Sequence, residues 1–284
     1  MNPKRLVSLL LCTLLLCTLL PAVTPAARAE ENDDMSDFLQ GDGTEDSPYE
    51  IYDEWDLDAV QLQFFKFDQW DLHAVLMNDI TISKKNEWLA SSTGDQPFLG
   101  TFDGQGYAII GLGIGATYCN GLIRYVGSGG VVRNLELRES RHTCGIWEYA
   151  MGCVVHINYG TVENCVVTGS IESDKGRIGG VVGVNYGRVT NCAFNGNASS
   201  TDYVGGVVGI NYGVVENCHH TGNVYGQNDV GGVVGLNEGT VINCYHTGYE
   251  QPVTNDAVVS GNNYVGGVAG ANGGRSSTAT TRAT

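Results

Sequence analysis

Short apolar runs alternate with glycine and asparagine along most of the chain, and this pattern recurs in register. Aligned on the glycine before each Val-x-Asn-Cys, repeat units begin at Gly160, Gly187, Gly213 and Gly239, in steps of 27, 26 and 26 residues. Within a unit, a later segment reads Gly-Gly-Val-Val-Gly-x-Asn or a close variant. A fifth unit is predicted to begin at Gly273, a step of 34.

Weaker copies of the unit precede the regular ones. Gly152–Asn158 resembles the double-glycine segment, Gly130–Leu135 resembles the start of a unit, and Ile109–Leu112 fits one more copy. This alignment predicts one column of stacked apolar side chains, made of Leu112, Leu135, Cys165, Cys192, Cys218 and Cys244. The residues directly before them form a second column, made of Gly111, Asn134, Asn164, Asn191, Asn217 and Asn243.

The composition of the units favours strands over helices. They are rich in Gly, Val, Asn and Thr, and apolar pieces of three to five residues are separated by turn residues. Three short strands with their turns fit into about 26 residues. One such coil cannot bury its inner face, but stacked coils can, because each strand then pairs in parallel with its copies above and below. The fold class predicted for residues 99–273 is therefore an all-β, parallel β-solenoid, right-handed by the crossover rule.

The two columns then have different physical roles. Asparagine tolerates the left-handed backbone conformation of a sharp corner better than other residues with a side chain. Its carboxamide can also bond to the copy in the next coil. Leu and Cys in the neighbouring column are expected to point inward and to pack as small hydrophobic groups.

The segments before the solenoid are predicted to have separate roles. Residues 1–29 have the basic, apolar and small-residue regions of a signal peptide, with cleavage near Ala29. Residues 30–45 form an acidic linker and 46–98 an N-terminal cap, in which Leu57, Val60 and Phe64 share helical spacing. This cap is expected to close the first coil. Cap packing is also the expected role of the four tryptophans, Trp55, Trp70, Trp88 and Trp147.

The repeated text resembles the GLUG-motif repeat of exported bacterial proteins. The resemblance rests on Val-Gly-Gly-Val-Val-Gly-x-Asn followed by Gly-x-Val-x-Asn-Cys and Thr-Gly, and it spans roughly residues 41–273. It implies a β-helix of the pectin-lyase-like type. Similar repeats occur in non-catalytic regions of IgA-cleaving metallopeptidases, so the resemblance implies a scaffold more than an activity.

Charge narrows the choice of partners. The chain of 284 residues has a formal net charge of −16, and removal of residues 1–29 leaves 12 basic residues against 31 acidic ones. Nucleic acid is excluded as an expected partner because phosphate binding needs a basic patch. No apolar run outside the signal is long enough to span a membrane. The expected location is secreted or at the cell surface.

Cysteine and histidine spacing indicates neither a cofactor nor a metal site. There is no Cys-x-x-Cys pair and no His-Glu-x-x-His. His220 and His246 share one column and could approach a metal together, but two ligands without a third do not make a site. Cys119, Cys144 and Cys153 lie outside the cysteine column, and the sequence leaves open whether two of them form a disulfide.

Two departures from the repeat are candidate binding loops. The first lies in the irregular early coil and the second in the long segment before the last double glycine. The candidate residues are Arg138, Arg141, His142, Trp147 and Glu148 in the first, and Tyr249, Asn262 and Tyr264 in the second.

The function expected from these observations is a non-enzymatic, exported scaffold for adhesion, display or binding of an extracellular protein or glycan. The alternative is a carbohydrate-active β-helix enzyme, which needs clustered carboxylates with Lys or Arg on one face. Glu163 and Glu216 share an outward column, but Thr190 and Ile242 occupy its other copies.

The last eleven residues, 274–284, break the pattern. Their composition is typical of a disordered tail. The same residues can also be encoded by codons that, read one frame away, give Thr-Val-Val-Asp-Cys-Tyr-Asn-Thr-Gly-Asn, which is a further repeat. We therefore expect an out-of-frame repeat here and a chain that is a portion of a larger surface protein.

Overall fold

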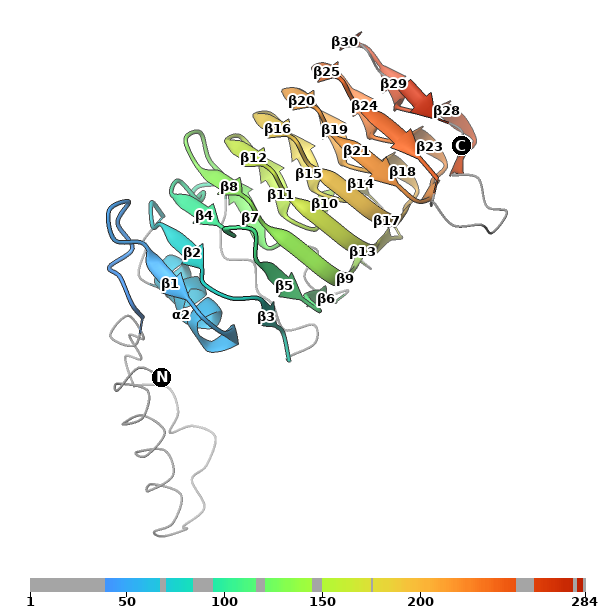
Figure 1. The fold of residues 1–284 in the computed structure, drawn as a ribbon. Coiled ribbons are helices and arrows are strands. Elements are labelled where there is room, and N and C mark those ends of the chain that lie inside the picture. Colours follow the sequence, from blue (N-terminus) through green and yellow to red (C-terminus); the bar gives the residue numbers. More distant parts are fainter. Residues whose placement is uncertain are drawn as a thin grey trace, which may run out of the picture.

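In the computed structural model, the chain winds into a parallel β-solenoid with a small N-terminal cap (Figure 1). The structure describes residues 39–66, 70–83, 94–115, 121–144, 150–174, 176–248, 258–277 and 280–282. The expected signal peptide, most of the acidic linker, and Cys119, Trp88, Trp147, Glu148 and Tyr249 lie outside these ranges.

Four parallel sheets form the sides of the solenoid, and each regular coil crosses them in the order D, C, A, B. Sheet D contains β10 (Ala150–Gly152), β14 (Arg177–Gly179), β18 (Asp202–Gly205), β23 (Asn228–Gly231) and β28 (Asn263–Gly266). Sheet C contains β7 (Ile123–Val126), β11 (Val155–Asn158), β15 (Val182–Asn185), β19 (Val208–Asn211), β24 (Val234–Asn237) and β29 (Ala269–Asn272).

Sheets A and B extend from the cap to the C-terminal coil. Sheet A contains β1 (Tyr49–Ile51), β2 (Ala74–Leu76), β4 (Thr101–Asp103), β8 (Val131–Arg133), β12 (Thr161–Glu163), β16 (Arg188–Thr190), β20 (Val214–Glu216), β25 (Thr240–Ile242) and β30 (Arg275–Ser277). Sheet B contains β3 (Ile80–Thr81), β5 (Ala108–Ile110), β6 (Gly113–Ile114), β9 (Glu136–Cys144), β13 (Val166–Ser173), β17 (Ala193–Ser199), β21 (His219–Thr221), β22 (Val224–Tyr225), β26 (Tyr245–Thr247), β27 (Val259–Ser260) and β31 (Thr280–Arg282).

The register of the sheets follows the sequence repeat. Val162, Val189, Val215 and Val241 are successive partners in sheet A, and all four are fully buried. Parallel pairing of identical positions gives every strand its hydrogen bonds and gives every valine the same inward direction. The prediction of a parallel β-solenoid is confirmed.

The double glycine lets an aromatic ring of sheet B lie against the backbone at the D–C corner. A Cβ on Gly180 would lie 2.2 Å from the ring of Phe194, and one on Gly206 would lie 2.3 Å from the ring of His220. Real Cβ contacts do not reach such distances, so only glycine fits there. The double glycine is therefore required by the close packing of these rings against the backbone, and not only by the turn.

Asparagine occupies the corner between sheets A and B in left-handed conformation. Asn134, Asn164, Asn191, Asn217 and Asn243 have φ between 51° and 54°. Their carboxamides connect neighbouring coils: Nδ2 donates from Asn164 to Oδ1 of Asn134 at 3.0 Å, from Asn191 to Asn164 at 3.2 Å and from Asn243 to Asn217 at 3.3 Å. We call these five residues the corner column.

A second asparagine column lies at the end of sheet C and was not predicted. Asn158, Asn185, Asn211 and Asn237 are fully buried, and each donates from Nδ2 to Oδ1 of the asparagine one coil further, at 2.8 Å in every case. Asn272 is the last acceptor. We call these five residues the inner column.

Two predicted alignments are wrong at the ends of the array. Ile109 pairs with Leu137, and Gly113 pairs with Arg141. Leu112 therefore lies beside Ser140 at the bend of sheet B, and not in the column of Leu135. The early coil has extra residues around Gln105, which the alignment did not allow for.

At the other end, Thr240 pairs with Arg275. Gly274, and not Gly273, therefore takes the place of Gly239, and the step is 35 residues, as between Asn237 and Asn272.

The cap helix α2 (Glu54–Lys66) begins where Asp53 Oδ1 accepts the backbone N–H groups of Trp55 and Asp56 at 3.0 and 3.2 Å. Leu57, Val60 and Phe64 face the core, as their spacing predicts. Trp70 also packs against the core. Trp55 does not fit the expected cap role, because it lies on the outer side of the helix and is 67% exposed.

Candidate functional site

The first candidate loop is largely a strand. Residues 136–144 form β9 and pair with β13 along sheet B. His142 alternates into the core and is fully buried, so it is not part of a surface loop. Arg138 is held by Glu136 at 2.7 Å and by Asp79 at 3.1 Å. Of the described candidates in this segment, Arg141 is the one that is exposed and outside these ion pairs.

Arg141 lines a groove over sheet B with a volume of about 820 Å³. The groove crosses four consecutive strands where sheet B bends. Its lining residues are Gly111, Gly113, Glu139, Ser140, Arg141, Gly169, Ser170 and Asn197. Most of them are small or neutral polar residues, so backbone and hydroxyl groups form the floor of the groove. The charged residues in the lining are Glu139 and Arg141.

A β-bulge lies at the bend beside this groove. Leu137 pairs with Val167 and Ser140 with Gly169, so β9 has one residue more than β13 in this interval. Glu139 takes up the difference with φ of 54°, and its N–H donates to Oγ1 of Thr168 at 3.2 Å. The bulge makes Glu139 and Arg141 successive exposed side chains on either side of buried Ser140.

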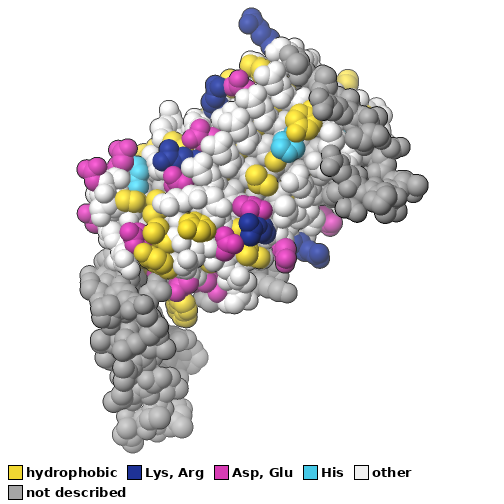
Figure 2. Space-filling view, viewed as in Figure 1, with side chains coloured by type: hydrophobic (Ala, Val, Ile, Leu, Met, Phe, Trp, Pro, Cys, Tyr) yellow, Lys and Arg dark blue, Asp and Glu magenta, His cyan; other side chains and the backbone are white. Residues whose placement is uncertain are grey.

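The outer face of sheet B continues from the groove as rows of neutral polar side chains. Asn195 pairs with Thr168 and Thr221, and the hydroxyls of Thr221 and Thr247 are 3.3 Å apart. In the next row, Oδ1 of Asn197 accepts the N–H of Asn223 at 3.1 Å. In Figure 2, few charged side chains lie over the middle of the visible face, and most of those visible are near the N-terminal coils.

The second candidate segment is shorter than expected. Val259 pairs with Val224, so β27 continues sheet B within the segment expected to be a loop. The excursion between β26 and β27 falls mostly on residues that the structure does not describe. Asn262 is exposed and its N–H donates to the Gln227 carbonyl at 2.7 Å. Tyr264 is 70% exposed with φ of 51°, on the outer side of sheet D.

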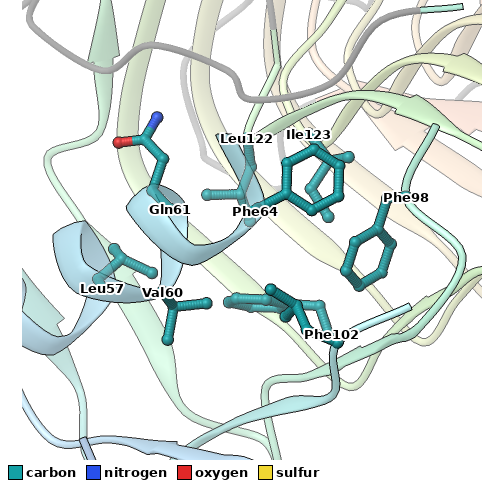
Figure 3. Close-up of a pocket in the computed structure, with 9 residues that line it drawn as sticks. Leu57, Val60, Gln61, Phe64, Phe98, Phe102, Leu122 and Ile123 are labelled. Carbon is teal, nitrogen blue, oxygen red and sulfur yellow. The ribbon is translucent and has the colours of Figure 1, made fainter. Parts of the chain in front are cut away.

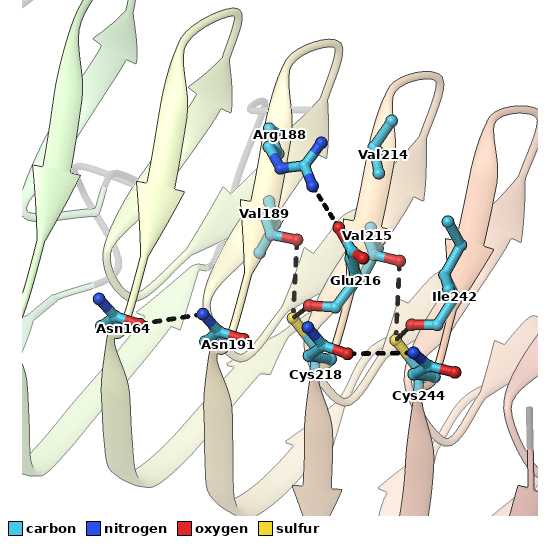
Figure 4. A network of polar contacts seen from close by, with 12 residues as sticks. Asn164, Arg188, Val189, Asn191, Val214, Val215, Glu216, Cys218, Ile242 and Cys244 are labelled. Carbon is cyan, nitrogen blue, oxygen red and sulfur yellow. Dashed lines mark hydrogen bonds and ion pairs between the residues drawn. The ribbon is translucent and has the colours of Figure 1, made fainter.

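The cysteine column is buried and its thiols are hydrogen-bonded. Cys165, Cys192, Cys218 and Cys244 are free, and each Sγ donates to the carbonyl two residues earlier, at 3.2–3.3 Å. Each also points to a carbonyl of the preceding coil, as Figure 4 shows for Cys218 and Cys244. Burial raises the pKa of the Cys192 and Cys218 thiols, which keeps them protonated. The side chain of Cys144 is not described, and Cys153 is buried and free.

His220 and His246 form a hydrogen-bonded pair inside the core. Their Nδ1 atoms are 2.9 Å apart, and Nε2 of His220 is 2.9 Å from the Gly196 carbonyl. Nε2 of His220 must donate to this carbonyl, so its Nδ1 accepts from Nδ1–H of His246. Burial, with a smaller contribution from His246, lowers the pKa of His220 to about 3. The column therefore packs as neutral rings, and the described residues hold no cluster of three metal-ligating side chains.

Two arginines of sheet A form ion pairs with carboxylates of neighbouring strands. Arg133 contacts Asp103 at 2.8 Å, and Arg188 contacts Glu216 (Figure 4). Burial raises the pKa of Asp103, but hydrogen bonds from the Gln105 N–H and from the Asn134 and Arg133 side chains outweigh it, so the pKa is lowered. A carboxyl group held ionised in this way is a poor proton donor.

A small apolar cavity of about 40 Å³ separates the cap helix from the first coils. Leu57, Val60 and Phe64 of α2 face Phe98 and Phe102 across it (Figure 3). Its walls carry no charged group, so it has the character of a packing defect between cap and solenoid.

The sequence interpretation missed Ser170 and Asn197 in the groove, and it missed the inner column. The signal for the inner column was present, since every regular unit ends its double-glycine segment with asparagine. The groove had no such signal, because it depends on the bulge at Glu139. Among the described residues, no helix is long and apolar enough to span a membrane.

Comparisons with known proteins agree on the repeat. The family model "The GLUG motif" matches residues 200–225. Halomucin of Haloquadratum walsbyi is 32% identical over 53% of this chain, and a "Putative Gly-rich membrane protein" of Evansella cellulosilytica is 32% identical over 47%. These matches cover 2% and 16% of the two relatives, so the chain corresponds to a small part of each.

A solved structure shares the fold. It is a "putative immunoglobulin A1 protease" from Bacteroides ovatus, with a TM-score of 0.66 and 20% identity over 85% of this chain and 77% of that one. This likeness shows the architecture and not the activity. The chain therefore contains a GLUG motif at residues 200–225, within an array of similar repeats that builds a parallel β-solenoid.

Proposed function

We propose that the protein is an exported, non-enzymatic scaffold that binds an extracellular glycan or protein through the groove on sheet B. The observation that carries the proposal is the groove itself, which interrupts an otherwise regular face and presents exposed Arg141 beside neutral Ser170 and Asn197. Irregular coils are where repeat proteins commonly bind.

The chemistry of the groove suits a hydroxyl-rich ligand. Oδ1 of Asn197 is already used by a backbone N–H, which leaves its NH₂ group as a donor. Arg141 supplies further donors and Glu139 supplies acceptors. The overall charge of −16 repels polyanions at long range, so a neutral glycan or a weakly charged protein surface fits better than an acidic polymer.

The alternative of a carbohydrate-active enzyme has less support. Glycoside hydrolysis uses two carboxyl groups, one of which must donate a proton. The described groove lining contains one carboxylate, that of Glu139. On sheet A, Asp103 and Glu216 are paired with arginines, and Thr190 separates Glu163 from Glu216 in the register.

The proposed location is the cell surface. The sequence has a signal peptide pattern, and one relative is named as a membrane protein. Attachment through a larger polypeptide is consistent with the small share of the relatives that this chain covers. The protease chemistry named for the solved neighbour is not transferred, because the sequence has no His-Glu-x-x-His.

A glycan and protein array probed with residues 30–284 tests the proposal. We expect at least one class of ligand to bind, and Arg141→Ala and Ser170→Phe to weaken its binding about tenfold or more, which is about 1.4 kcal/mol. Arg188→Ala is the matched control, because it removes an arginine from sheet A and leaves the groove intact. Absence of binding, or equal loss in the control, would count against the groove. Release of sugar fragments from a polysaccharide would favour the enzyme instead.

A further inference from the structure

Three tyrosines form an exposed stack at the corner between sheets C and A. Tyr159, Tyr186 and Tyr212 follow the inner-column asparagines in the repeated Asn-Tyr-Gly and are 50%, 45% and 46% exposed. Ring centroids are 4.8 Å apart between Tyr159 and Tyr186, and 4.9 Å between Tyr186 and Tyr212. The interplanar angles are 5° and 11°. Neither the groove nor the core uses these rings.

The backbone holds the rings in register. Asn158, Asn185 and Asn211 are joined by hydrogen bonds of 2.8 Å directly before the tyrosines. The next N–H groups donate across coils, from Tyr186 to the Asn158 carbonyl and from Tyr212 to the Asn185 carbonyl, both at 2.8 Å. The spacing of the rings is therefore a fixed property of the solenoid, and the rings retain freedom mainly about their side-chain torsions.

We propose that this stack is a site of oxidative phenol coupling, in which Tyr186 becomes covalently joined to Tyr159 or to Tyr212. A peroxide-dependent haem peroxidase removes one electron and one proton from each of two adjacent phenols. The two radicals form a carbon–carbon bond between their ortho positions, and the two ring protons at those carbons move to the phenol oxygens as the rings regain aromaticity. Hydrogen peroxide takes the two electrons, together with the two protons removed at the start, and leaves as two waters.

The geometry favours coupling within one molecule. The stacked rings are separated by less than the length of one side chain, so a second phenol is always next to the first radical. Burial, reinforced by Tyr159 and Tyr212, raises the pKa of Tyr186 although Arg177 opposes it, so its phenol stays protonated at neutral pH. The oxidant must therefore accept hydrogen atoms from phenols, as a peroxidase does, and not depend on phenolate.

Such a bond would staple neighbouring coils. It would close a loop of 26 or 27 residues, as given by the spacing of the paired asparagines. Cross-links of this kind restrict the unfolded chain. An exported solenoid would gain resistance to unfolding without a disulfide, since the described cysteines of the column are inside the core.

The test treats residues 30–284 at low concentration with a haem peroxidase and hydrogen peroxide. We expect a monomer that has lost two hydrogen atoms, the blue fluorescence of coupled phenols, and a mass-mapped link between the peptide of Tyr186 and that of Tyr159 or Tyr212. Tyr186→Phe keeps the stacked ring and removes the reactive phenol, and it leaves the other two rings about 9.6 Å apart. It should abolish the linked monomer.

Tyr264→Phe is the matched control, because it removes a phenol that is 70% exposed and lies on sheet D, outside the stack. It should leave the yield of linked monomer unchanged. The proposal is overturned if Tyr186→Phe couples as well as the unaltered chain, if the mapped link joins other tyrosines, or if only links between molecules form. Circular dichroism of each variant confirms that the solenoid is intact before oxidation.

Discussion

The inner and corner columns contain the same amino acid, repeat with the same period and share four coils, but they stabilise the solenoid in different ways. Four of the five inner asparagines are fully buried, Asn272 in the last coil is exposed, and the bonds between them are uniform at 2.8 Å. The corner asparagines are mostly exposed, their bonds are 3.0–3.3 Å, and all have positive φ. The inner column depends on the carboxamide, and the corner column depends on the backbone.

The surroundings explain the difference. Nδ2 of Asn211 donates to Asn237 at 2.8 Å and also lies 3.3 and 3.2 Å from the carbonyls of Gly213 and Thr240, while its Oδ1 accepts from Asn185 and from the Gly213 N–H. A buried polar group without partners is costly, so each member of the column requires the next. At the corner, water can replace any missing partner.

The largest expected effect is from Asn211→Ala. It removes the 2.8 Å bonds that link Asn211 to Asn185 and Asn237, takes the side-chain acceptor from the Gly213 N–H, and opens a cavity in the core. We expect the free energy of unfolding to fall by about 3 kcal/mol or more. Urea denaturation measures the change. An effect below about 1 kcal/mol would mean that the column is not a cooperative network.

Acid is the next largest perturbation, because the His220–His246 contact is also buried and polar, and it can titrate. The pKa of His220 is near 3 in the folded chain and near 6.5 unfolded. The unfolded state therefore binds more protons, so this stability is complete above about pH 6.5 and is lost as the pH falls towards 3. We expect a loss on the order of 2 kcal/mol by pH 5.

The measurement is the urea midpoint between pH 7.5 and 5. His220→Phe together with His246→Phe, which repeats the phenylalanine found at Phe194 in the same column, should flatten this dependence. If the double variant keeps the full acid sensitivity, the titrating group lies elsewhere.

The smallest expected change in stability comes from substitutions of Asn217, and it tests the contrast between the two columns directly. Asn217→Ala should cost about 1 kcal/mol, because alanine resists the φ of 54° that this corner requires. Asn217→Gly should cost only a few tenths of a kcal/mol, because glycine adopts this conformation readily. Thermal unfolding of both variants measures the order. The two columns would be equivalent if Asn217→Gly were as damaging as Asn211→Gly.

The sequence predicts most of the solenoid because a register repeated four times leaves little freedom. The cysteine column, the corner column and the helix around Leu57 follow from spacing alone. The thiol hydrogen bonds and the inner column needed the structure, since Asn158 and its copies could have faced either way. Residue 276 pairs with Val241 in sheet A. The first valine of the out-of-frame reading would fall at this position, and that reading stays a prediction.

The candidate site was harder to predict than the fold. Arg141 was identified by its departure from the repeat, but His142, its neighbour, proved to be buried because a strand alternates its side chains. The bulge at Glu139 changes that alternation locally, and the spacing of the repeat does not reveal where an extra residue is inserted.

The step of 35 residues between Asn237 and Asn272 has a consequence for how such a protein can vary. The extra residues enter between β26 and β27, yet both strands still pair with β21 and β22, and both asparagine columns continue up to or past them. New sequence can therefore be added at this bend of sheet B while every other position keeps its length. The equivalent bend at Gly222, between β21 and β22, offers the same freedom, so a peptide can be grafted along this edge of the molecule without redesign of the coil.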